Sequence, residues 1–294
     1  MSNITKGLLA SIISAVLFGL MPLATKFLYS YGLNTITVVF FRQIIALPVV
    51  MILLKNTDKV KLSGKDVFEA SRIIIFGMLF TQIMLYASYN YISTGLATTL
   101  HYIYPTFVVI GMVIFYKAKM TWVKISCVLL CTVGIILFYE HVGQVQLNGM
   151  LIALGSGLSY AYYLISLSRS NIKFIPPMQY AFLYVVITSV AVFIYGISTR
   201  SLHWFWPIEA WLVMVVFSIT ITIIAVLLVR YAVKFIEPEV VSIVSTLEPI
   251  TSIVIGALYL NEIITIRTAI GMVCILSAVV IISIFTENNR KKES

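Results

Sequence analysis

Hydrophobic residues occur along the chain in runs of about 20, the length of an α-helix that crosses the hydrocarbon core of a bilayer. Short polar stretches separate these runs, and each run is predicted to be one membrane-spanning helix. The predicted fold class is therefore an all-α integral membrane protein with ten transmembrane helices. The expected spans are 7–29, 35–54, 72–91, 95–116, 122–139, 149–168, 177–197, 208–229, 238–260 and 264–285.

The composition agrees with this pattern. Of the 294 residues, 61% are hydrophobic and 11% are charged, whereas a soluble domain carries about 25% charged residues. Soluble enzymes, nucleic-acid-binding proteins and disordered proteins are thereby excluded. The net charge of +9 is better explained by orientation in a membrane than by a nucleic-acid partner.

The basic residues fall on one side of the predicted spans. With the N-terminus in the cytoplasm, 16 of the 20 Lys and Arg residues lie in cytoplasmic loops and tails. Only Arg200 and Arg267 lie in outer loops, while Lys26 and Arg42 lie within spans. Because short basic loops stay in the cytoplasm, we expect a multi-pass protein of the cell membrane with both termini cytoplasmic.

The chain also repeats itself. A shift of 144 residues, or 142 near the start of each half, brings similar residues into register, and five spans per copy means that the copies enter the membrane from opposite sides. The sequence therefore predicts two inverted five-helix repeats, 1–143 and 144–294, the second with a basic cytoplasmic tail. A chance match between apolar helices is the alternative. The matched pairs include Ile92 with Ile236, Pro105 with Pro249, Thr121 with Thr265, and Gly7 with Gly149.

Several residues carry a family resemblance over 7–285. They are Leu247-Glu248-Pro249, Glu262, Gly271, Arg42 and Tyr104-Pro105. In these the chain resembles the drug/metabolite transporter superfamily, specifically its ten-span EamA-type members. Ala118 stands where the first repeat of the family commonly carries a Glu, which argues against a role that needs a matched pair of loop carboxylates.

The resemblance implies a secondary transporter that moves small metabolites such as amino acids, often outward, by alternating access. An uptake permease or a multidrug or amine efflux transporter of the same fold is the alternative. A membrane-embedded enzyme that processes lipids is disfavoured, because such an enzyme needs a cluster of polar catalytic groups. The chain lacks a nucleotide-binding phosphate loop and a metal-binding pattern. We therefore expect no enzymatic activity, no cofactor and no metal, and partners limited to a solute, the bilayer and at most a second copy.

Glu248 is the strongest candidate for a coupling or gating residue. It lies about eleven residues into its span, roughly 16 Å deep, where a carboxyl group must be protonated, paired or exposed to a cavity. A structural carboxyl group bonded to a carbonyl freed by Pro249 is the alternative. His101 is the second candidate because an imidazole titrates in the physiological range. Pro105 and Pro249 should break their helices.

Further polar side chains in the spans are candidates for binding the solute. Gln82, Tyr86 and Asn90 are spaced four apart and predict a polar stripe on the third span. Arg42 could hold a solute carboxylate, pair with Glu248, or extend towards the membrane surface. The predicted solute-binding residues are Arg42, Gln82, Tyr86, Asn90, His101, Tyr104, Tyr160, Tyr163 and Glu248, with the hydroxyl of Tyr102 nearby.

Overall fold

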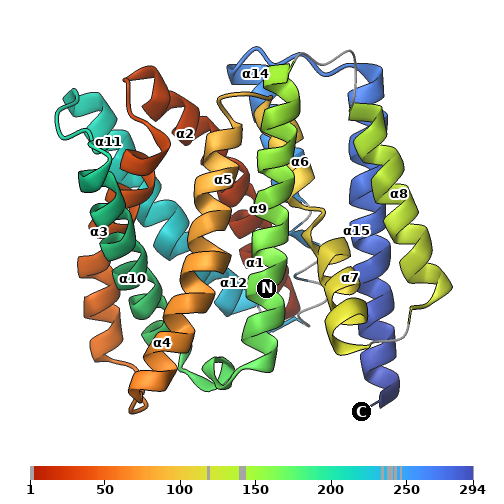
Figure 1. Ribbon diagram of the computed structural model, residues 1–294, viewed down its shortest axis with the longest axis horizontal. Helices are drawn as coiled ribbons and strands as arrows, with labels where there is room; N and C mark the ends of the chain where they lie inside the picture. Colours follow the sequence, from red (N-terminus) through yellow and green to blue (C-terminus); the bar gives the residue numbers. More distant parts are fainter. Residues whose placement is uncertain are drawn as a thin grey trace.

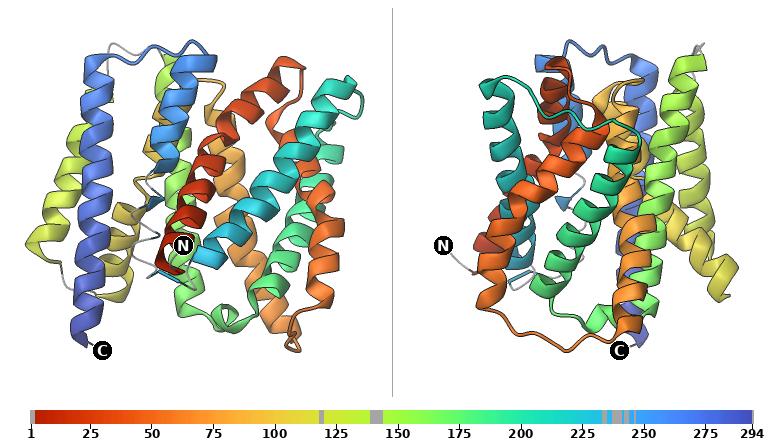
Figure 2. Two further views of the ribbon diagram at one scale, coloured as in Figure 1. Left: turned by 180° about the vertical axis from the view of Figure 1, so that it is seen from behind. Right: turned by 60° about the vertical axis from the view of Figure 1, so that its left-hand side comes forward.

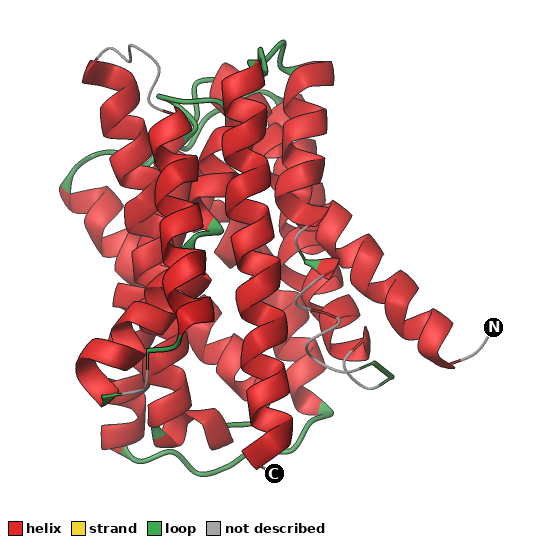
Figure 3. Cartoon of the chain, turned by 90° about the vertical axis from the view of Figure 1, so that its right-hand side faces the viewer, coloured by secondary structure: helices red, strands yellow, loops and turns green. Residues whose placement is uncertain are grey.

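The computed structural model describes residues 3–117, 120–138, 144–232, 235–236, 241, 244–245 and 247–293. These residues form helices joined by short loops, and the described part of the chain has no β-strand (Figure 3). The elements are α1 (Asn3–Gly19), α2 (Met21–Ser30), α3 (Thr35–Lys55), α4 (Gly64–Ile73), η1 (Ile74–Leu79), α5 (Phe80–Ser88), α6 (Thr94–His101), α7 (Tyr104–Tyr116), α8 (Trp122–Phe138), α9 (Gln144–Arg169), η2 (Asn171–Phe174), α10 (Pro177–Ser198), α11 (Ile208–Phe217), η3 (Ser218–Ala225), α12 (Val226–Ala232), α14 (Leu247–Tyr259) and α15 (Ile266–Glu293).

Seven helical segments of the described residues are long and apolar enough to cross a membrane. Three shorter apolar helices, Trp122–Gly134, Leu247–Tyr259 and Ile266–Ile281, occupy the predicted fifth, ninth and tenth spans. The helices lie side by side with a common long direction (Figure 1). The predicted all-helical membrane fold is confirmed.

The third span begins earlier than predicted. Its helix starts at Gly64, so the expectation of a loop up to residue 71 is wrong. Ser63 accepts a hydrogen bond from the backbone N–H of Asp66, and the Asp66 carboxylate accepts one from the N–H of Ser63. This capping box satisfies the free amides at the helix start. The helix therefore extends through polar residues that a hydropathy pattern assigns to a loop.

The fourth span is broken at its proline, as predicted. α6 ends at His101, and α7 begins at Tyr104 with Pro105 in its first turn. In the ninth span α14 begins at Leu247, with Pro249 in its first turn. Proline has no N–H and fits only the first turn of a helix. The two matched prolines therefore place helix N-termini within the membrane-spanning part of the bundle.

Structural details repeat with the same register as the sequence. The π-helices η1 and η3 begin at Ile74 and Ser218, 144 positions apart. Lys117 and Asn261, also 144 positions apart, have φ values of 53° and 54°, in the left-handed region that few non-glycine residues adopt. Such local irregularities are not expected of unrelated apolar helices. They support the internal repeat against a chance match.

Equivalent helices of the two repeats pack against each other. α8 packs on α15 at one side of the bundle, and α3 packs on α10 at the other (Figures 1 and 2). Between these pairs, α9 packs on α5, and α1 packs on α12 and η3. Each contact joins one repeat to the other. The fold is therefore one interlocked bundle with an approximate two-fold relation between its halves.

Candidate functional site

Two groups of polar side chains lie in the interior of the bundle. The Glu248 group consists of Glu248, His101, Tyr102, Tyr104, Tyr160 and Tyr163, from the fourth, sixth and ninth spans. The Arg42 group consists of Arg42, Gln43, Gln82, Tyr86, Tyr184 and Thr222, from the second, third, seventh and eighth spans. Polar groups in this position need partners inside the protein, because lipid offers none.

Glu248 is the second residue of α14 and lies near the middle of the membrane. It lies eleven positions before the end of α14 at Tyr259, a rise of about 16 Å, about half of a 30 Å hydrocarbon core. Its Oε2 atom lies 2.8 Å from the hydroxyl oxygen of Tyr102. The partial positive charge at the helix N-terminus also favours an acidic side chain there. Glu248 as a whole residue is half-buried, and its carboxyl group points into the protein towards Tyr102.

A row of aromatic rings begins near this carboxyl group, at Tyr104 and Tyr160. The ring centroid of Tyr104 lies 4.7 Å from that of Tyr160, and the Tyr160 ring stacks on Tyr163 at 5.6 Å. All three tyrosines are half-buried. Ring faces attract cations, and a nearby carboxylate adds to that attraction. The Glu248 group is therefore suited to a positively charged nitrogen.

His101 is held by a hydrogen bond to the sixth span. Its Nδ1 atom lies 3.0 Å from the hydroxyl oxygen of Ser156. That hydroxyl donates its only proton to the carbonyl of Ala153, at 2.6 Å. The Nδ1 atom of His101 is therefore the donor to Ser156, which fixes the tautomer of a neutral ring. This geometry favours a positioning role for His101, between α6 and α9.

Arg42 joins three spans in the interior. Its Nε atom donates to Thr222 Oγ1 at 3.0 Å, and Nη1 donates to the hydroxyl of Tyr86. The guanidinium also lies over the ring of Phe217, with 5.5 Å from Cζ to the ring centroid. Only 6% of Arg42 is exposed, so the side chain does not extend to the membrane surface. Its hydrogen-bond partners are neutral, so it is not directly paired with Glu248.

Gln43, Gln82 and Tyr184 form the other part of the Arg42 group. The Gln43 amide donates to Gln82 Oε1 at 3.2 Å and to the Tyr184 hydroxyl at 2.7 Å. The Gln82 amide also donates to Tyr184. Sequence reasoning missed Gln43 and Tyr184. A glutamine beside Arg42 in an apolar run was an available signal, whereas a tyrosine in the seventh span carries none.

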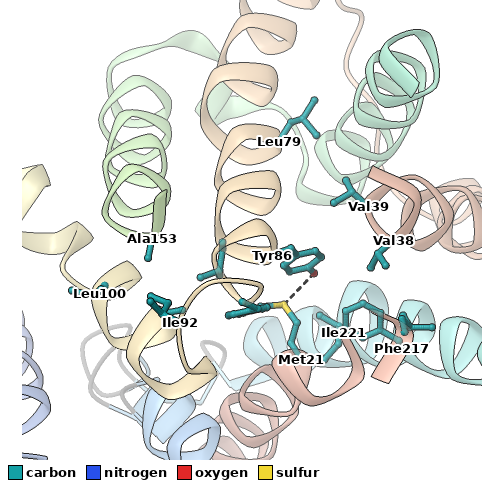
Figure 4. Packing of buried hydrophobic residues seen from close by; sticks show 14 of the residues in the cluster. Met21, Val38, Val39, Leu79, Tyr86, Ile92, Leu100, Ala153, Phe217 and Ile221 are labelled. Atoms are coloured by element: carbon teal, nitrogen blue, oxygen red, sulfur yellow. Dashed lines mark hydrogen bonds between the residues drawn. The ribbon is translucent and has the colours of Figure 1, made fainter. Parts of the chain in front are cut away.

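Tyr86 brings the two groups close together. Its hydroxyl contacts Arg42 and lies 3.2 Å from the sulfur of Met21, as the dashed line in Figure 4 shows. Tyr86 and its neighbour Tyr89 are also near enough to Glu248 for its charge to act on them. The third span, which carries both tyrosines, therefore contributes to the Arg42 group and lies next to the Glu248 group.

Asn90 lies apart from both groups. α5 ends at Ser88, and Asn90 is exposed in the following turn, where its amide donates to the carbonyl of Ala87 at 3.3 Å. The structure thus brings Gln82 and Tyr86 of the predicted stripe together and leaves Asn90 outside. Pro105 and Pro249 lie in the first turns of their helices, next to the Glu248 group.

Inverted repeats with helix ends near the midplane are the architecture of many secondary membrane transporters. The EamA-like transporter family model matches residues 5–140 and 147–284, so the chain belongs to the EamA-like transporter family. It is a multi-pass membrane transporter built from two repeats. The two matches fall within the predicted repeats 1–143 and 144–294, whose boundaries stay a prediction.

Two further comparisons add the fold but no substrate. A solved structure titled "Crystal structure of protein" is similar over 99% of both chains, with a TM-score of 0.63 and 14% sequence identity. This likeness concerns the fold alone. No curated protein matches the chain.

Proposed function

We propose that this chain is a secondary transporter that exports small metabolites such as amino acids and related compounds by alternating access. The observation that supports it best is the position of Glu248. The carboxyl group lies near mid-membrane, at a helix N-terminus, and faces the break in the fourth span across the hydroxyl of Tyr102. Ionisable groups at such places serve solute or proton pathways.

Glu248 and the tyrosine rings of its group receive the positively charged nitrogen of the solute. The two interlocked repeats then exchange conformations, so that the same site faces first one side of the membrane and then the other. Protons couple to this cycle through Glu248, because a carboxyl group in this position binds either a proton or the cationic solute. We place both termini in the cytoplasm and favour export from the family resemblance.

Amine efflux is the second candidate, favoured by the same group of residues. An amino acid also carries a carboxylate, and the Arg42 guanidinium that could bind it is buried and engaged by Thr222 and Tyr86. The charged nitrogen is thus the part of the solute with the clearest binding partner. A solute with an ammonium group and no carboxylate would satisfy the Glu248 group equally well.

Uptake into proteoliposomes tests the proposal. Purified protein is reconstituted, and uptake of a labelled amino-acid mixture is measured with and without a proton gradient, then with labelled amines. The wild type should accumulate one of the two solute classes above the level of empty vesicles. Uptake by Glu248→Gln should no longer depend on the proton gradient, because a glutamine amide does not bind a proton in the physiological pH range.

Glu209→Gln is the matched control, since Glu209 is an exposed acidic residue in the first turn of α11. It should behave as the wild type. Uptake of neither class by folded protein under any gradient would contradict the proposed solutes. Gradient-driven uptake by Glu248→Gln at the wild-type level would instead contradict coupling through Glu248.

A further inference from the structure

The hydroxyl of Tyr102 lies between two hydrogen-bond acceptors. Its oxygen is 2.8 Å from Glu248 Oε2 and 2.9 Å from the backbone carbonyl oxygen of Ser245. A phenol has one proton and donates it to one acceptor at a time, and a carbonyl oxygen never donates. Both bonds therefore exist together only when Glu248 is protonated and donates to Tyr102, which in turn donates to Ser245.

The carbonyl of Ser245 needs this donor because of Pro249. In a continuous helix the carbonyl of residue 245 would accept the N–H of residue 249, and proline has none. The N–H of Glu248 bonds to the same carbonyl at 3.0 Å, which leaves its second lone pair for the Tyr102 hydroxyl. Tyr102 thus replaces the missing amide and ties the break in the fourth span to the start of α14.

The first repeat lacks this device. The matched carbonyl, that of His101, lies four residues before Pro105 and faces the backbone of α9. A Cβ atom on Gly157 would lie 2.8 Å from it. A close backbone approach therefore occupies the place that a tyrosine hydroxyl takes in the second repeat.

We propose that Tyr102 is a positioning residue that converts the protonation state of Glu248 into a change at the N-terminus of α14. With Glu248 protonated, the chain of bonds from Glu248 through Tyr102 to Ser245 holds the first turn of α14 in place. When Glu248 releases its proton to water, the Tyr102 hydroxyl turns to the carboxylate, because charge-assisted hydrogen bonds are the stronger ones. The Ser245 carbonyl then keeps only the N–H of Glu248 as its donor, and the turn that joins Ser245 to α14 is loosened.

Among the described residues, Glu248 is the acidic side chain in this set of hydrogen bonds. The other groups close enough for its charge to act on them are tyrosines: Tyr86 and Tyr89 of the third span, Tyr102 and Tyr104 of the fourth, and Tyr160 of the sixth. α1, α2 and α6 also pack on α14, and their ionisable side chains are Lys6, Lys26, Tyr29 and His101. The inference deepens the proposed function, because movement of α14 would serve transport.

Hydrogen exchange of the full protein in detergent, without solute, tests this inference. Deuterium uptake at the first turns of α14 is followed by mass spectrometry across a range of pH and corrected for the intrinsic pH dependence of exchange. In the wild type, corrected uptake should rise as the pH rises through the transition of Glu248. In Glu248→Gln it should stay low throughout, because the amide donates to Tyr102 as a protonated carboxyl group does.

Tyr102→Phe should give high uptake at every pH, since no side-chain hydroxyl then reaches the Ser245 carbonyl in either protonation state of Glu248. Tyr89→Phe is the matched control. Tyr89 is also buried and within reach of the Glu248 charge, but its hydroxyl interacts with Thr98 and not with Glu248 or Ser245. It should keep the wild-type pH dependence. The inference would be overturned if deuterium uptake in Tyr102→Phe kept the wild-type pH dependence, or if the wild type showed none. Failure of solute uptake in the liposome experiment would leave this measurement unaffected.

Discussion

Buried polar side chains in this bundle satisfy one another across the two repeats, and Arg42 shows this most clearly. A guanidinium in a membrane span is costly when it faces lipid, but here two of its nitrogens bond to Thr222 and Tyr86, and its own carbonyl accepts from Ser218 at 2.6 Å. These partners come from the third and eighth spans. Arg42 therefore holds the second span between them.

Arg42→Lys should destabilise the protein by about 1–3 kcal/mol, because a single ammonium group cannot bond to both partners in the same geometry. Thermal unfolding in detergent measures this as a lower Tm. Arg267→Lys, at an exposed position, should leave the Tm unchanged. If Arg42→Lys instead kept the wild-type Tm and weakened solute binding, Arg42 would be a solute ligand.

At the scale of elements, the end of the second repeat holds the start of α6 in the first. Oε1 of Glu262 accepts from the N–H of Thr94 at 2.8 Å, and Oε2 accepts from the Thr94 hydroxyl at 3.0 Å. Glu262 lies in the loop after α14, so this cap joins the two repeats at one end of the bundle. The position 144 residues earlier is Ala118, which lies outside the described residues and has no carboxylate to offer.

Glu262→Ala should destabilise the start of α6 by about 1–2 kcal/mol, the usual cost of losing a helix cap. Hydrogen exchange at Leu96 and Ala97 should then become faster than in the wild type, whereas exchange elsewhere in the protein should not. Glu209→Ala is the control, because it also removes an acidic side chain. Glu209 lies in the first turn of α11, a helix that has no side-chain cap. Equal exchange in the two variants would contradict a capping role for Glu262.

The elements themselves could be predicted because their signals are local. Apolar runs, Pro105 and Pro249 act within a few residues of their own positions. The partners of Arg42 could not be predicted, since Thr222 is 180 residues away and an isolated threonine in an apolar run carries no signal. Asn90 was misplaced because its four-residue spacing continues a helix that in fact ends at Ser88.

At the scale of the whole molecule, the two-fold relation predicts paired close contacts at opposite ends of the bundle. A Cβ atom on Gly7 of α1 would lie 3.0 Å from the Ile236 and Phe235 side chains, and one on Gly149 of α9 would lie 2.9 Å from Ile92 and 2.5 Å from Tyr91. Each glycine thus lets its helix pack closely against the segment that leads into a broken span of the other repeat. In alternating access, one contact should open while the other stays closed.

Substituting valine for each of these two glycines should therefore favour states that are open at opposite ends of the bundle. Gly149→Val should favour the state that is open at the outer end, and Gly7→Val the state open at the inner end, because overpacking destabilises each closed contact by about 1–3 kcal/mol. A reporter, Tyr104→Cys, is introduced after Cys127, Cys131 and Cys274 are replaced by Ser. Its labelling by an impermeant thiol reagent is then measured from each side of oriented vesicles.

Labelling should rise at least about fivefold from the outer side in Gly149→Val and from the inner side in Gly7→Val, as a shift of 1 kcal/mol or more requires. Gly64→Val is the control, because no atom lies within 4 Å of a Cβ at Gly64, and it should label as the parent does. A rise from the same side in both glycine variants would contradict the alternation. Opposite rises would mean that the matched contacts of the two repeats act as the two gates of one transporter, since the same substitution at equivalent positions then has mirror-image effects.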